Sequence, residues 1–166
     1  MSRSGPTTQR NAWYQTLRAN SRVMELFEVE LQRECGMSLA WYDVLSCLYL
    51  SPDHAMRMCD LAEQVLMSRS WLTRRVDQLV KADLVERCSA ENDGRGVQAR
   101  LTRTGKRTFI KLQRSHGTAI DRHFSAYLSA EDAEVLIRVM GKIAESADRA
   151  LKADTPIAPK TNALKS

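Results

Sequence analysis

A single interval, residues 84–101, interrupts a chain whose apolar residues otherwise recur at helical spacing. Two short runs that favour β-structure, 84–88 and 97–101, enclose a polar loop. At the centre of that loop an arginine stands between two glycines and close to an aspartate: Asp93, Gly94, Arg95 and Gly96. Loops of this composition between short strands are typical of hairpins. The sequence therefore predicts a mainly α fold with one small β-hairpin.

Apolar stripes and capping residues delimit the expected helices. Gly36 is a candidate C-cap for the first helix, Ser38 begins the second, and Ser68 and Thr102 are candidate N-caps. The residues from Ser129 approximate a capping box. The predicted helices span 9–34, 38–50, 58–66, 68–82, 103–126 and 130–151.

Four regions follow from this order of elements. We expect disordered ends at 1–9 and 152–166, and a compact centre at 53–101. The flanking helical regions, 10–52 and 102–151, are too long to bury a face within one small chain. We therefore expect the first, fifth and sixth helices to form a subunit interface.

Positive charge is concentrated in one part of the chain. The 166 residues carry a net charge of +5. Between 68 and 107 there are ten basic and five acidic residues, so this quarter of the chain has the same net charge as the whole. Such a local excess favours an anionic partner.

The helix predicted over 68–82 has two distinct sides. At about 100° per residue, one side is apolar: Leu72, Val76, Leu79 and Val80. The opposite side carries hydroxyls and charges, with Arg69 beside it: Ser70, Thr73, Arg74 and Asp77. With the preceding short helix it predicts a helix-turn-helix whose second helix enters the DNA major groove. The alternative is a solvated amphipathic helix with incidental arginines.

The loop at the tip of the hairpin suits a second contact. Gly94 and Gly96 permit close approach to another backbone, and Arg95 can enter a narrow minor groove. Asp93 can hold Arg95 extended through an ion pair. The alternative is a generic turn, for which the same residues are suitable.

Taken in order, these segments resemble the MarR family of bacterial transcriptional regulators over about 10–150. The resemblance rests on LA at 61–62, SRSWLTRRVDQL at 68–79, LVER at 84–87, DGRG at 93–96 and LTRTG at 101–105. It implies a homodimer with winged helix-turn-helix lobes on a helical dimerisation base, binding a palindromic operator in double-stranded DNA. It also implies groove-facing positions for Ser70, Thr73 and Arg74, and makes Arg95 the wing arginine. The predicted DNA-contacting residues are Ser68, Arg69, Ser70, Thr73, Arg74, Arg75 and Arg95, with Asp93, Gly94 and Gly96 supporting the wing.

Two positions depart from the family pattern. Asp83 stands where the family usually has glycine, so it must adopt a left-handed conformation or end the helix differently. Gly96 stands where a second wing arginine is common, which leaves open how many phosphates the wing contacts.

The resemblance further implies an effector pocket between the dimer base and the DNA-binding lobe. Four aromatics of the first two helices are candidates for stacking on a planar phenolic or aromatic ligand: Trp13, Tyr14, Trp41 and Tyr42. The alternative is that they pack in the core and the subunit interface. The predicted function is a DNA-binding regulator, a repressor that such a ligand releases. A winged-helix module that binds protein, without DNA, is the rival.

Other functions lack the residues that they need. The chain has no Gly-rich phosphate loop, nucleophile elbow or acid–base pair, so we expect neither an enzyme nor a bound cofactor. The histidine spacings match no metal motif, so no metal site is expected. Cys35, Cys59 and Cys88 leave a redox-responsive regulator open as an alternative. Without a signal sequence or an apolar span, we expect a soluble cytoplasmic protein with no membrane contact.

Overall fold

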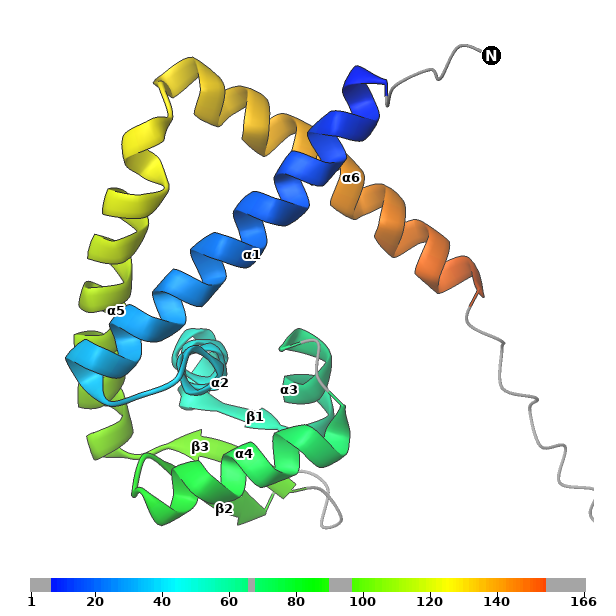
Figure 1. The fold of residues 1–166 in the computed structure, drawn as a ribbon. Coiled ribbons are helices and arrows are strands. Elements are labelled where there is room, and N and C mark those ends of the chain that lie inside the picture. Colours follow the sequence, from blue (N-terminus) through cyan, green and yellow to red (C-terminus); the bar gives the residue numbers. More distant parts are fainter. Residues whose placement is uncertain (1–6, 66–67, 90–96, 155–166) are drawn as a thin grey trace, which may run out of the picture. The chain divides into compact units, whose positions relative to one another are not determined.

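The computed structural model describes residues 7–65, 68–89 and 97–154. In chain order its elements are α1 (Thr8–Cys35), α2 (Leu39–Leu50), η1 (Pro52–His54), β1 (Ala55–Arg57), α3 (Met58–Gln64), α4 (Arg69–Lys81), β2 (Val85–Ser89), β3 (Val97–Leu101), α5 (Arg103–His123), η2 (Ser125–Tyr127) and α6 (Ala130–Asp154) (Figure 1). The predicted class, mainly α with a small β component, is confirmed. Two compact units divide between Ser125 and Ala126.

Local capping sets the helix boundaries, as the sequence indicates. α1 ends at Gly36, whose φ of 68° lies in the left-handed region that glycine adopts without steric cost. The Ser38 hydroxyl accepts a hydrogen bond from the Trp41 amide at the start of α2 (3.3 Å). The Thr102 hydroxyl accepts one from the Gly105 amide at the start of α5 (2.8 Å). These bonds satisfy amides that the first helical turn leaves without partners.

The sheet has three antiparallel strands in the order β1-β3-β2 (Figure 1). β2 and β3 form the predicted hairpin, with Val85 opposite Leu101 and Ser89 opposite Val97. The prediction of two strands was incomplete, because β1 pairs with the other edge of β3. All three residues of β1 are half-buried, so this segment lacks the alternation of buried and exposed residues that indicates a strand. β1 is extended because β3 supplies its hydrogen-bond partners.

The core of the first unit surrounds α2. This helix contacts α3, α4, α5, β1 and β3, and its Val44, Leu45 and Leu48 are fully buried. A single cluster of buried side chains joins them to residues of α4 and α5, including Leu72 and Phe109. Packing is therefore continuous across residue 53, the predicted boundary of the compact centre. The division into a dimerisation region and a lobe stays a prediction.

The junction between α4 and β2 is fixed by hydrogen bonds to the start of α5. Asp83 has a φ of 57°, which confirms the left-handed alternative for this position. Its carbonyl accepts a bond from the Thr102 hydroxyl (2.7 Å), and its carboxylate accepts one from the Thr104 hydroxyl (3.1 Å). Aspartate is tolerated in this left-handed conformation because hydrogen bonds from Thr102 and Thr104 hold both its carbonyl and its carboxylate.

The last helix belongs to the second unit. α5 ends at His123, earlier than the predicted residue 126, and a short 3-10 helix starts at Ser125. The predicted capping box is confirmed: the Ser129 hydroxyl accepts from the Asp132 amide, and the Asp132 carboxylate accepts from the Ser129 amide, both at 3.1 Å. α6 then runs for 25 residues, and none of its described side chains is buried in the single chain.

Candidate nucleic-acid interface

Helix α4 has one buried side, and three of the four apolar residues that the sequence pattern places there are buried. Leu72, Val76 and Leu79 are fully buried. Val80, which the pattern assigns to the same side, is 37% exposed. At about 100° per residue, Val80 lies roughly 80° around the helix from Leu72, at the margin of the buried stripe.

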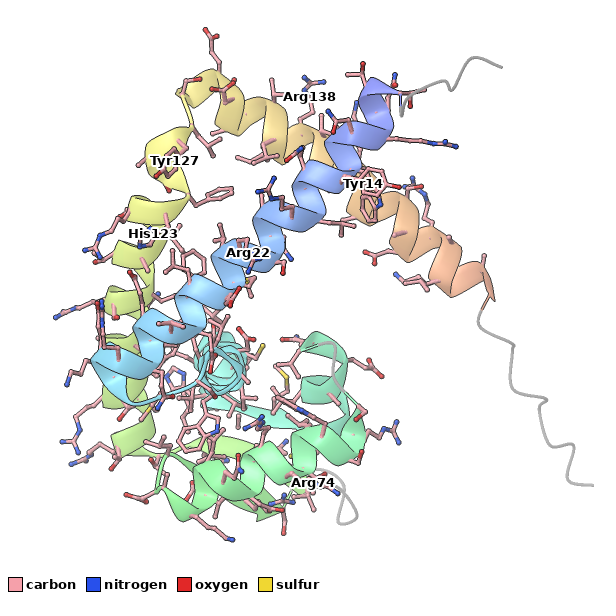
Figure 2. The ribbon with its side chains drawn as sticks, in the orientation of Figure 1. Tyr14, Arg22, Arg74, His123, Tyr127 and Arg138 are labelled. Carbon is pink, nitrogen blue, oxygen red and sulfur yellow. The ribbon has the colours of Figure 1, made fainter. Side chains whose placement is uncertain are left out.

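The opposite side of α4 is polar and open to solvent. Ser70, Thr73, Arg74 and Asp77 are all exposed, as is Arg69 near the start of the helix. Figure 2 shows Arg74 on the outer side of α4. The side chains of Arg69 and Arg74 form no hydrogen bond or ion pair with any other residue that the structure describes. Both guanidinium groups are therefore available to an external anion or base edge.

The hydroxyl groups of this region are already hydrogen-bonded. The Ser68 hydroxyl accepts from the Trp71 amide and lies 3.3 Å from the Ser70 hydroxyl. The Thr73 hydroxyl donates to the carbonyl oxygen of Arg69 (2.8 Å). Ser68 thus acts first as the N-cap of α4, and Thr73 keeps its methyl group and its oxygen lone pairs for an outside partner.

Arg75 lies on a different stripe of α4 from the exposed face. Its guanidinium carbon lies 4.6 Å from the centre of the Trp71 ring, and it donates a hydrogen bond to the Gln78 side-chain oxygen (3.2 Å). The side chain is half-buried. The Arg75 side chain therefore packs along its own helix, and the DNA contact that the sequence assigns to it stays a prediction.

An ion pair that the sequence analysis missed joins α4 to the hairpin. Arg87 on β2 donates to the Asp77 carboxylate at 2.8 Å. Ten positions separate the two residues in sequence, and no helix or strand periodicity links them. Only the register of β2 against α4 brings them together. The pair links β2 to the exposed face of α4.

The tip of the hairpin lies outside the described residues. Of the predicted wing, the structure describes the strands β2 and β3, which lead to and from the loop. The assignments made to Asp93, Gly94, Arg95 and Gly96 therefore stay predictions.

A cavity of about 440 Å³ lies between the α1–α2 junction and the C-terminal half of α4. Two cationic side chains, Arg75 and Lys81, face it together with the Trp41 ring, and no acidic residue lines it. The lining residues are Gln32, Gly36, Met37, Ser38, Trp41, Arg75, Gln78 and Lys81. This combination suits a planar ligand that carries negative charge.

Of the four aromatics that the sequence assigns to a ligand pocket, only Trp41 lines this cavity. Trp13 and Tyr14 lie near the start of α1, 57% and 60% exposed. Figure 2 labels Tyr14 on this part of α1. More than 20 helical residues, roughly 30 Å at 1.5 Å each, separate them from the cavity at Gly36. Tyr42 packs against Phe109, 5.6 Å between ring centres. Within one subunit, the four do not form one site.

A half-buried histidine lies behind Tyr42. The His116 ring is 4.5 Å from the Tyr42 ring and 5.0 Å from the Phe27 ring. Its Nδ1 atom has no hydrogen-bond partner among the described residues. Burial lowers the pKa of His116 and raises that of Tyr42, to which the nearby Asp43 charge adds. Both groups are therefore neutral at pH 7 and hold α1, α2 and α5 together by aromatic packing.

The cysteines are free thiols in different surroundings. Cys47 packs against the core, and burial raises the pKa of its thiol. Cys59 is exposed, and its thiol donates a hydrogen bond to a carboxylate oxygen of Asp60 (3.1 Å). Cys35 and Cys88 are half-buried.

Within 7–65, 68–89 and 97–154, no three His, Cys, Asp or Glu side chains gather as metal ligands would. None of the helices there is long and apolar enough to cross a membrane.

A buried α2, a helix pair α3–α4 and a three-stranded antiparallel sheet ending in a hairpin define a winged helix-turn-helix protein. Residues 36–96 match the MarR family. AbsC, a MarR family transcriptional regulator from Streptomyces coelicolor, is 33% identical with a TM-score of 0.81, over 89% of this chain and 99% of AbsC. The chain belongs to the MarR family of transcriptional regulators.

Two further solved structures are similar to this chain. Sco3205, a MarR family transcriptional regulator from Streptomyces coelicolor solved in complex with DNA, is 28% identical over 87% of this chain and 91% of its own, with a TM-score of 0.79. A mutant of MarR from E. coli, complexed with operator DNA, shares the fold at 22% identity, over 78% of this chain and 91% of its own, with a TM-score of 0.70. No curated protein matches the sequence.

Proposed function

We propose that the chain binds a palindromic operator in double-stranded DNA as a homodimer, with α4 of each subunit in a major groove. The exposed face of α4 carries this proposal. The side chains of Arg69 and Arg74 are unpaired within the described chain and stand beside hydroxyl groups near a positively polarised helix start. Such a face suits both phosphates and base edges. The DNA complex of the 28%-identical Sco3205 supports it.

The hairpin is the second proposed contact. β2 and β3 form the hairpin that carries this loop, and the Asp77–Arg87 pair links β2 to α4. In the proposal Arg95 enters the minor groove beside the half-site, with Asp93, Gly94 and Gly96 shaping the loop. The two contacts would then span adjacent grooves of one half-site.

The Arg74→Ala substitution tests base reading by α4. An arginine that reads a guanine edge contributes about 1–3 kcal/mol of discrimination, so the variant should lose roughly 10- to 100-fold on the operator and much less on random DNA. Arg114→Ala is the matched control, since Arg114 is exposed on α5. Both variants are compared with the wild type by gel shift on the operator and on a scrambled duplex at one salt concentration. Equal losses on both duplexes would reassign Arg74 to phosphate.

The rival function makes a different prediction for the wild type. A winged-helix module that binds only protein would show no affinity for the operator even at low salt, where phosphate contacts are strongest. The excess of basic residues between 68 and 107 argues against it, because charges are depleted at the centre of protein interfaces.

We further propose that the regulator is a repressor released by a planar aromatic ligand with negative charge. The cavity at Trp41, Arg75 and Lys81 supports this, since it combines an aromatic face with two cations. Arg75 and Lys81 belong to α4, whose other side carries Thr73 and Arg74. A ligand that binds Arg75 and Lys81 therefore acts on the same helix that presents Thr73 and Arg74 to DNA. Binding of the ligand would displace this helix and so lower the affinity for DNA.

Benzoate and benzamide separate the charge of such a ligand from its shape. Benzoate should raise the melting temperature of the wild type more than benzamide at equal concentration, because only the carboxylate pairs with Arg75 and Lys81. Lys81→Met should reduce the benzoate shift, whereas Lys111→Met on α5 should preserve it. The measurement is thermal shift, with gel shift for release from DNA. A response that is equal for both compounds, or unchanged in Lys81→Met, would contradict the proposed site.

The homodimer is supported by apolar surface that the single chain leaves open. Trp13, Tyr14 and Leu17 on α1 are between 47% and 60% exposed. On α6, Val139 is 41% and Ile143 55% exposed. Clusters of large apolar side chains on long amphipathic helices are typical of subunit interfaces.

A further inference from the structure

The hydroxyl of Thr73 is directed inward, toward its own helix. It donates to the Arg69 carbonyl, one turn earlier, at 2.8 Å. Because both branches of a threonine side chain leave the same carbon, this bond also fixes the direction of the methyl group. The side chain is exposed, so the methyl group lies on the open face of α4.

That methyl group distinguishes Thr73 from the other side chains of the same face. Ser70, Arg74 and Asp77 carry no methyl group, and Asp77 is bound to Arg87. In the major groove the only apolar feature among the base edges is the C5-methyl group of thymine. A threonine methyl is one of the groups that contacts it favourably.

We propose that Thr73 determines specificity for a thymine in each half-site, through contact between its methyl group and the thymine methyl. The assignment rests on the proposed function, since it requires α4 in the major groove. The exposed Arg74, next to Thr73 in sequence, is the residue proposed above to read a guanine edge through hydrogen bonds. Thr73 adds an apolar contact, which hydrogen-bond donors cannot supply.

Serine and valine at position 73 separate the methyl group from the hydroxyl. Thr73→Ser keeps a hydroxyl able to donate to the Arg69 carbonyl and removes the methyl group. Thr73→Val keeps a methyl group on both branches and removes the hydroxyl. All three residues have similar helix propensities, so the variants should fold alike, which circular dichroism checks.

The DNA is altered in the same way, by removing a single methyl group. An operator is selected from a random pool with the wild-type chain, and each thymine of one half-site is replaced in turn by deoxyuridine, which lacks only the methyl. At one position the wild type should lose about fourfold in affinity, the factor expected for one buried methyl-sized group. Thr73→Ser should bind both duplexes equally, and Thr73→Val should keep the fourfold preference.

Thr118→Ser is the matched control, because Thr118 is exposed on α5 and donates the same kind of bond to the Arg114 carbonyl (3.0 Å). It should keep the full preference for thymine. The proposal is overturned if no thymine shows the effect, or if Thr73→Ser retains it. It is also overturned if Thr73→Val loses the preference for thymine while Thr73→Ser keeps it. The hydroxyl oxygen, and not the methyl group, would then recognise the base. A wild type that selects no DNA overturns the proposed function itself.

Discussion

Replacing Gly105 with alanine should destabilise the first unit by about 3 kcal/mol or more, the upper range for overpacking in a core. A Cβ at this position would lie 1.9 Å from the carbonyl oxygen of Leu84 and 2.9 Å from its carbon. Both are backbone atoms, and the same oxygen accepts the Thr102 amide at 3.1 Å. The clash therefore cannot be relieved by a side-chain rotation. It would separate the start of α5 from the junction of α4 and β2.

Gly117 provides the matched control on the same helix. Nothing lies within 4 Å of a Cβ built there, so Gly117→Ala should be neutral or stabilise the protein by about 0.5–1 kcal/mol. Urea unfolding of both variants measures the difference in the free energy of unfolding. Equal effects of the two substitutions would show that the close packing of Leu84 against Gly105 is not maintained in solution.

Ending the chain at Ser129 should abolish the proposed dimer and, with it, the proposed tight binding to a palindromic operator. The truncation removes α6 and its apolar stripe, in which Leu136 is half-buried and the other four residues are exposed: Val135, Leu136, Val139, Met140 and Ile143. Two half-sites bound by one dimer act together, whereas a monomer binds each half-site separately, so the loss should reach about 100-fold or more. Sedimentation and gel shift measure the two effects. A truncated chain that still forms an operator-binding dimer would rule out α6 as an interface helix.

A point substitution tests the same interface without shortening the chain. Ile143→Asp places a charge on the apolar stripe and should shift the protein toward monomer. Ile137→Asp makes the same change on the same helix, about 120° away at roughly 100° per residue. Ile137 is 75% exposed and lies off the stripe, so this control should remain dimeric. If both substitutions disrupt the dimer, the interface is not confined to the predicted stripe.

The sequence by itself determined the features that depend on neighbours three or four positions apart. Gly36, Ser38 and Thr102 mark helix ends because a cap bonds within its own first or last turn. The buried side of α4 followed from spacing alone, since Leu72, Val76 and Leu79 return to one face every turn. The left-handed Asp83 was one of two alternatives that its place at a helix end allowed. These local rules were sufficient for the fold class and for the exposed face proposed to contact DNA.

Only the tertiary structure decided which distant residues meet. β1 exists because β3 pairs with it across more than 40 residues, Asp77 meets Arg87 through the register of the hairpin, and Trp41 meets Lys81 across the cavity. Gly105 is critical only because the Leu84 carbonyl approaches it. Such contacts depend on how elements pack, and packing arranges side chains that no fixed spacing relates. The same packing turned Arg75 away from the exposed face of α4 and toward a ring and a cavity.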